Sequence, residues 1–115
     1  MPSTTVCKRG EIVLVRFVFA DEGGAKHRPA LVLSTDEYNS GRADVIVAAL
    51  TSNVSRLLPG DYLIVRWQDA GLPKPSVATA IVRTIKASMV ESSLGKLDRR
   101  DMARFSDGLK PLLGW

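Results

Sequence analysis

The sequence predicts a small, mainly β domain, a strongly bent barrel of about five strands followed by one C-terminal helix. Three observations favour this fold class. The chain has 115 residues, a length typical of one domain. Residues 11–86 alternate between short apolar runs and clusters of Gly, Pro and charged residues, which is the pattern of strands and turns. Few β chains this short can bury two complete sheets, so a bent barrel is expected rather than a sandwich.

Five segments have the composition of strands. The first, residues 11–20, is almost continuous Val, Ile, Leu and Phe, as expected for a strand covered on both faces. A charged, Gly-containing loop over residues 21–26 follows. The second strand is expected to begin at Pro29, because proline cannot donate a backbone hydrogen bond within a ladder. The second to fifth strands are predicted over residues 29–34, 44–50, 61–67 and 76–86.

A helix is predicted at the C-terminal end, where the apolar spacing changes. Asp98 can cap it, with Asp101 three residues later in the place of a capping-box partner. Apolar residues then follow at spacings of three, four and three and form one stripe that suits packing in a core or a dimer: Met102, Phe105, Leu109 and Leu112. Pro111 limits how far the helix extends.

The composition restricts the chemistry. With 16 basic and 12 acidic residues, the formal net charge of +4 favours partners that carry phosphate or carboxylate groups. The chain has one cysteine, Cys7, in the expected frayed N-terminal tail, and one histidine, His27. With these two residues it can form neither an intramolecular disulfide nor a Cys/His zinc cluster. We therefore expect no metal and no other cofactor.

Two further features concern location. The longest uncharged run, residues 45–55, is shorter than the roughly 20 apolar residues that a transmembrane helix needs. Residues 1–5 lack the basic start and apolar stretch of a secretion signal. A cytoplasmic protein without a membrane partner is therefore expected.

Three polar motifs stand next to the ends of predicted strands. An arginine guanidinium can hold two oxygens of one phosphate. Each motif also has a plain structural interpretation, such as a local ion pair for Arg28 or an ordinary turn after the third strand. The motifs are His27-Arg28-Pro29, Thr51-Ser52-Asn53 and Lys74-Pro75-Ser76.

In this order and spacing, the motifs resemble the MazF/PemK toxin family. The resemblance covers residues 8–110 and implies a single domain over residues 8–115 after a tail of residues 1–7. It rests on Lys8-Arg9-Gly10-Glu11-Ile12-Val13, His27-Arg28-Pro29-Ala30-Leu31-Val32-Leu33-Ser34 and Leu50-Thr51-Ser52, and continues in Leu72-Pro73-Lys74-Pro75-Ser76, Arg83-Thr84-Ile85 and Leu94-Gly95-Lys96-Leu97.

The resemblance implies a small SH3-like, MazF/CcdB-like barrel of about five to seven strands with a C-terminal helix. It also implies a homodimer that acts as the toxin of a bacterial type II toxin–antitoxin system. Such toxins cleave single-stranded RNA at short sequences and are neutralised by a cognate antitoxin. In members of the family the matching arginine and threonine contact the scissile phosphate, which assigns catalytic roles to Arg28 and Thr51.

RNA supplies its own nucleophile, the 2′-hydroxyl, so such a reaction needs neither a metal nor a covalent side chain. We expect Arg28 to stabilise the developing phosphorane charge and to protonate the leaving oxygen, while Thr51 donates a hydrogen bond. The products would be a 2′,3′-cyclic phosphate and a 5′-hydroxyl. Substrate-binding roles are expected for the remaining polar side chains of the motifs: His27, Ser52, Lys74 and Ser76.

One segment departs from the family pattern. Thr79-Ala80-Ile81 stands where better-known members carry an acidic residue and a glutamine, so an expected acid–base partner is missing. His27 is a candidate substitute because imidazole titrates near neutrality. Two alternatives stay open. The first is a non-enzymatic gyrase inhibitor, because the end Leu113-Gly114-Trp115 superficially resembles the apolar C-terminal tail of the sister family of gyrase poisons. The second is an RNA-binding relative that has lost catalysis.

Overall fold

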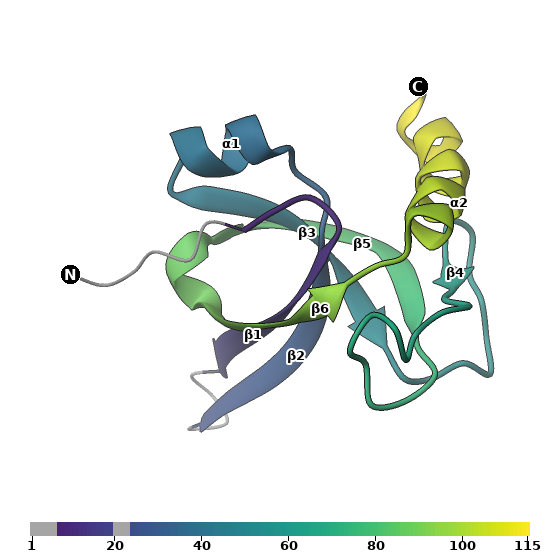
Figure 1. Ribbon diagram of the computed structural model, residues 1–115, viewed down its shortest axis with the longest axis horizontal. Coiled ribbons are helices and arrows are strands. Elements are labelled where there is room, and N and C mark those ends of the chain that lie inside the picture. The colour runs from purple at the N-terminus through teal and green to yellow at the C-terminus, as the bar shows by residue number, and fades with distance from the viewer. Residues whose placement is uncertain (1–6, 20–23) are drawn as a thin grey trace.

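A computed structural model describes residues 7–19 and 24–115 (Figure 1). In this part of the chain, antiparallel strands form one sheet in the order β4-β5-β3-β2-β1-β6. The strands are β1 (Glu11–Phe19), β2 (Gly24–Val32), β3 (Asp44–Thr51), β4 (Tyr62–Leu63), β5 (Val77–Lys86) and β6 (Val90–Lys96). The helices are α1 (Asp36–Gly41) and α2 (Arg99–Leu109), with 3-10 turns at Ala87–Met89 and Lys110–Leu113.

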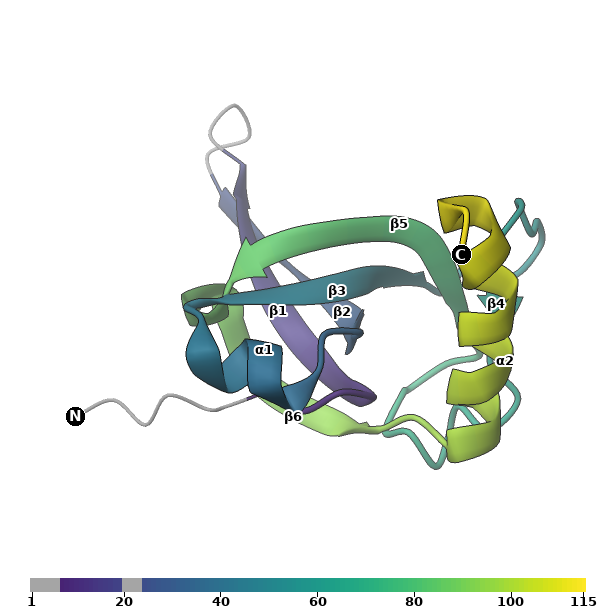
Figure 2. The ribbon, with the colours of Figure 1, turned by 90° about the horizontal axis from the view of Figure 1, so that it is seen from above.

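The sheet is bent into a barrel, with β5 arching over the other strands and the two helices at opposite sides (Figures 1 and 2). The predicted fold class, a mainly β barrel with a C-terminal helix, is confirmed. Neighbouring residues of β1 belong to different apolar clusters, Ile12 to one and Val13 to the other. Because successive side chains of a strand point to opposite faces, β1 is buried on both faces, as its composition predicts.

Two elements are absent from the prediction. The strand β6 is polar and largely exposed, and in the described part of the chain its one partner is β1, through a register with two shifts. An edge strand with one partner needs no apolar alternation, so its sequence carries no strand signal. The short helix α1 is capped by Thr35, whose Oγ1 accepts a hydrogen bond from the Tyr38 backbone nitrogen at 3.2 Å.

Two of the predicted strands have the wrong extent. The second strand spans Gly24–Val32 rather than residues 29–34, because residues 24–31 pair with β1. Pro29 is tolerated since the ladder to β3 starts only at Ala30. The fourth strand ends at Leu63 instead of residue 67. Of the predicted 21–26 loop, residues 24–26 belong to β2, and residues 21–23 lie outside the described part.

The N-terminal cysteine is not in a frayed tail. Cys7 is 3% exposed and packs in the apolar cluster around Val13, Val45 and Ile85. Its carbonyl accepts a hydrogen bond from Nδ2 of Asn39 at 2.9 Å. Burial, followed by the nearby Glu11 charge, raises the pKa of the Cys7 thiol, so the thiol stays protonated and inert at neutral pH.

The C-terminal helix is largely as predicted. α2 begins at Arg99, and the side chain of Asp98 accepts from the Arg100 backbone nitrogen at 3.0 Å. Phe105 and Leu109 are buried, whereas Leu112 lies beyond the helix in a 3-10 turn and is 52% exposed. None of the helices in the described ranges is both long and apolar enough to cross a membrane.

Candidate active site

The end of β3 lies in a groove that gathers five of the six residues predicted for the site. The groove has a volume of about 590 Å³ and is formed by β1, β2, β3, β5 and residues 72–76. The five residues, contributed by three separate segments of the chain, are Arg28, Thr51, Ser52, Lys74 and Ser76.

The register of the sheet explains why these residues meet. β2 and β3 pair with Ala30 opposite Ala49. Continuing this antiparallel register by two residues, past the end of the ladder, places Arg28 opposite Thr51. On its other side, β3 pairs with β5 at Thr51 opposite Val77, directly after Ser76. The sheet order β5-β3-β2 therefore brings three motifs together that are far apart in the sequence.

The groove is strongly biased toward positive charge. Three cations line it, Arg28, Lys74 and Arg83, and no Asp, Glu or His is among its described lining residues. Arg28 is exposed and forms no ion pair with any residue in the described ranges, so a local salt bridge does not account for it there. Cations without nearby carboxylates attract an anion such as a phosphodiester.

The hydroxyl groups of the groove differ in what they can donate. Oγ1 of Thr51 accepts a hydrogen bond from the Asn53 backbone nitrogen at 3.1 Å, which leaves its own proton for a ligand. This contact also builds the predicted turn. Ser76 is 4% exposed, and its Oγ donates to the Lys74 carbonyl at 2.9 Å. Ser76 therefore shapes the backbone at Lys74 rather than offering a proton to substrate.

His27 is not part of the groove. Its Nε2 lies 2.9 Å from Oε1 of Glu91 on β6, and both side chains are about half exposed. Consecutive residues of β2 point to opposite faces of the sheet, so the neighbour of Arg28 faces away from it. In this arrangement His27 does not supply the missing acid–base group.

The segment 79–81, whose sequence departs from the family pattern, contributes one side chain to the groove. Ile81 is 60% exposed and lines it. Thr79 is buried, and its Oγ1 donates to the Ala49 carbonyl at 2.8 Å, beside the irregularity where the β3–β5 register shifts. Thr79 thus satisfies a carbonyl where the regular β3–β5 pairing is interrupted.

Arg83 is a groove residue absent from the predicted site. Its guanidinium carbon lies 5.0 Å from the centroid of the Phe17 ring, a cation–π geometry, and both residues line the groove. Arg83 is two residues from Ile81 on β5, so both share one face of the strand. That exposed Ile-x-Arg pair is the sequence signal that could have identified it.

Comparisons with known proteins agree with the resemblance. Residues 8–113 match the family described as the PemK-like, MazF-like toxin of type II toxin–antitoxin systems. The chain is 36% identical over 93 residues to Endoribonuclease MazF6 of Mycobacterium tuberculosis, covering 77% of this chain and 80% of that protein. Endoribonuclease MazF2 of Mycobacterium bovis gives the same values.

Solved structures show the same fold. MazF (Form-I) from Deinococcus radiodurans superimposes with a TM-score of 0.74 at 26% identity, over 96% of this chain and 98% of that one. An endoribonuclease in complex with its cognate antitoxin from a Mycobacterial species gives a TM-score of 0.76 at 21% identity, over 94% and 95%. The chain therefore belongs to the family of PemK-like, MazF-like toxins of type II toxin–antitoxin systems.

Proposed function

We propose that this protein is a toxin with endoribonuclease activity, which cleaves single-stranded RNA without a metal ion. The observation that carries the proposal is the groove in which Arg28 and Thr51 meet, with three cations and no acidic lining residue in the described part. The relatives named as endoribonucleases support this function, and they favour it over gyrase inhibition. The groove also gives Arg28 and Thr51 a role that gyrase inhibition would not require.

The reaction is a phosphodiester transfer within the RNA. The 2′-oxygen attacks phosphorus and loses its proton to solvent, the bond to the 5′-oxygen breaks, and that oxygen takes a proton from the Arg28 guanidinium, which solvent then reprotonates. Arg28 donates N–H bonds to the phosphorane oxygens and supports departure of the 5′-oxygen, and Thr51 donates its hydroxyl proton. Since no carboxylate or imidazole lines the described groove, stabilisation of the developing charge is the main contribution of the protein.

The remaining groove residues bind the substrate on either side of the scissile phosphate. Lys74 is exposed and offers a point charge to a neighbouring phosphate. The guanidinium of Arg83, whose carbon lies 5.0 Å from the centroid of the Phe17 ring, offers a planar group to a nucleobase, and Ile81 adds an exposed apolar side chain beside it. Unpaired bases of RNA stack on such surfaces.

The proposal includes two protein partners. A cognate antitoxin is supported by the solved structures of related toxins with theirs, and the net charge of +4 favours an acidic segment in such a partner. A homodimer is supported by large apolar residues exposed near the C-terminal end, Leu112, Leu113 and Trp115. The cytoplasm is the proposed place of action because the RNA substrate is there.

Incubation of the purified protein with single-stranded RNA in excess chelator tests the function. We expect fragments that end in a 2′,3′-cyclic phosphate and begin with a 5′-hydroxyl. Binding of intact RNA would instead support the relative without catalysis. Intact RNA together with inhibition of DNA gyrase would support the other alternative.

A further inference from the structure

Residues 64–76 form a closed loop that ends in the groove. Its two ends are joined, since the Ile64 backbone nitrogen donates to the Ser76 carbonyl at 3.0 Å. Further backbone hydrogen bonds fold its interior, from Ala70 to Trp67 at 3.2 Å, from Gly71 to Gln68 at 3.1 Å and from Leu72 to Trp67 at 3.1 Å. The last residues of this loop, Leu72 to Lys74 and Ser76, line the groove.

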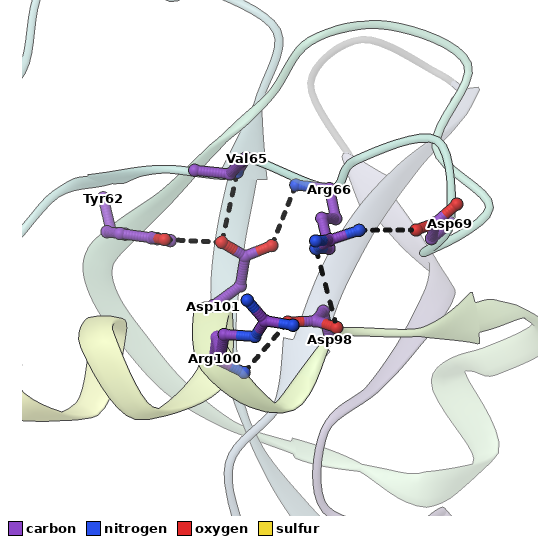
Figure 3. Close-up of polar contacts among 7 residues, drawn as sticks. All are labelled: Tyr62, Val65, Arg66, Asp69, Asp98, Arg100 and Asp101. Carbon is purple, nitrogen blue, oxygen red and sulfur yellow. Dashed lines mark hydrogen bonds and ion pairs between the residues drawn. The ribbon is translucent and has the colours of Figure 1, made fainter.

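The beginning of the loop is fixed by a buried carboxylate from α2 (Figure 3). Asp101 is 2% exposed. Its Oδ1 accepts from the Tyr62 hydroxyl at 2.5 Å and from the Val65 backbone nitrogen at 3.2 Å, and its Oδ2 accepts from the Arg66 backbone nitrogen at 2.9 Å. Two consecutive backbone N–H groups and one hydroxyl thus converge on one carboxylate.

The middle of the loop is fixed by β6. Gly71 has a φ of +82°, and a Cβ added there would lie 1.9 Å from the Leu94 carbonyl oxygen. A Cβ added to Gly95 would lie 2.3 Å from the Ala70 carbonyl oxygen. This backbone-to-backbone contact leaves no room for residues 70–71 to move toward the sheet, and the buried side chains of Ala70 and Leu72 oppose movement away from it.

We propose that Asp101 is a positioning residue for substrate binding, because it fixes the loop that carries Lys74 in the groove. The inference rests on the proposed cleavage of RNA. Asp101 does not line the groove, so it acts only through the loop. A phosphate contact away from the reacting atoms is equally strong in the bound substrate and in the transition state. Loss of this positioning therefore raises KM and leaves kcat unchanged.

A double-mutant cycle tests the inference, with Asp101→Asn, Lys74→Ala, the double variant and the parent compared on one RNA below their melting temperatures. The Asp101→Asn variant would turn an amide N–H group toward one of the two backbone donors, which releases that part of the loop. We expect Lys74→Ala to raise KM about tenfold, in line with a charge-assisted contact. Asp101→Asn should raise KM severalfold with kcat unchanged, and the double variant should not exceed Lys74→Ala.

Tyr62→Phe is the matched control. It removes one donor from the same carboxylate but leaves both backbone N–H bonds of the loop. It should lower stability without changing KM. An unchanged KM in folded Asp101→Asn, additive effects in the cycle, or an equal rise of KM in Tyr62→Phe would each overturn the inference. A parent that cleaves no RNA would overturn the proposed function instead.

A second measurement applies if Asp101→Asn does not fold. In the parent, native-state hydrogen exchange at increasing guanidinium concentration reports which amides open together. If Asp101 holds the loop, the amides of residues 65, 66 and 72 open with those of α2 at one free energy. A loop that opens at a clearly lower free energy than α2 overturns the inference.

Discussion

The charged groups of Arg28 and Asp101 lie in opposite environments. Asp101 is 2% exposed and accepts three hydrogen bonds from Tyr62, Val65 and Arg66. Arg28 is exposed and has no ion-pair partner in the described ranges. A buried charge must be satisfied by the protein, whereas an exposed cation keeps its donors for a ligand. The comparison separates a charge that maintains the structure from one that serves binding.

The hydroxyls of the groove repeat the contrast. Ser76 donates its proton to the Lys74 carbonyl, whereas Oγ1 of Thr51 accepts from the Asn53 backbone nitrogen. Both line the same groove. For these two side chains, the direction of the hydrogen bond, rather than position in the groove, distinguishes a structural hydroxyl from one available to substrate.

The largest effect is expected at Arg28. Arg28→Ala should lower the rate of RNA cleavage by a factor on the order of 10²–10³, the usual result of removing one donor to a developing oxyanion. Its free energy of unfolding should stay within about 0.5 kcal/mol of the parent. Initial cleavage rates and urea unfolding provide the two measurements.

Arg42→Ala is the control for Arg28→Ala. Arg42 pairs with Asp44 at 3.1 Å and does not line the groove, so this variant loses the same charge elsewhere. An equal loss of activity in both variants would mean that overall charge, and not the position of Arg28, is responsible.

Substitution of Asp101, in contrast to that of Arg28, should mainly lower the stability of the fold. Asp101→Ala leaves the Tyr62 hydroxyl and the backbone N–H groups of Val65 and Arg66 without their acceptor. We expect a loss of about 2–3 kcal/mol in the free energy of unfolding, measured by urea denaturation. Asp107→Ala, an exposed carboxylate on the same helix, should change it by less than about 0.5 kcal/mol. A similar loss of stability in both variants would contradict a special structural role for the buried Asp101.

Substitutions of Arg83 can separate the contribution of its charge to RNA binding from that of its planar side chain. Arg83→Ala should weaken RNA binding about tenfold, which is within the range for loss of one base-stacking contact. Arg83→Lys keeps the charge but lacks the planar face. Recovery of affinity by lysine, measured by fluorescence anisotropy with a labelled oligonucleotide, would show that Arg83 acts by charge alone.

The smallest effect is expected at high pH. Burial, and then the hydrogen bond and charge of Asp101, raise the pKa of Tyr62 above its usual value near 10. The folded state thus favours the protonated phenol. This contribution to stability is complete below about pH 10 and is lost as the pH rises through the folded-state pKa. Unfolding followed from pH 8 to 11 should show a steeper decline for the parent than for Tyr62→Phe; parallel curves would contradict this cause.

Much of the fold could be predicted because its signals are local. The β-branched and aromatic run of β1 and the apolar stripe of α2 need no partner to be recognised, and the Asp98 cap is identified by its own side chain. The polar strand β6 has no such signal, since only its pairing with β1 makes it a strand. Asp101 shows the same limit. Its spacing from Asp98 predicts a capping-box partner, but its carboxylate binds residues 62–66 instead.

The sequence by itself determined the fold class, the excess of positive charge and, through the family resemblance, the importance of Arg28 and Thr51. Only the tertiary structure decided which neighbours act together. It separates His27 from Arg28, because adjacent strand residues face opposite sides. It joins Arg28, Thr51 and Lys74, because the order of strands brings distant segments together. It also gives Arg83 and Asp101 their roles, which depend on contacts with residues far away in the chain.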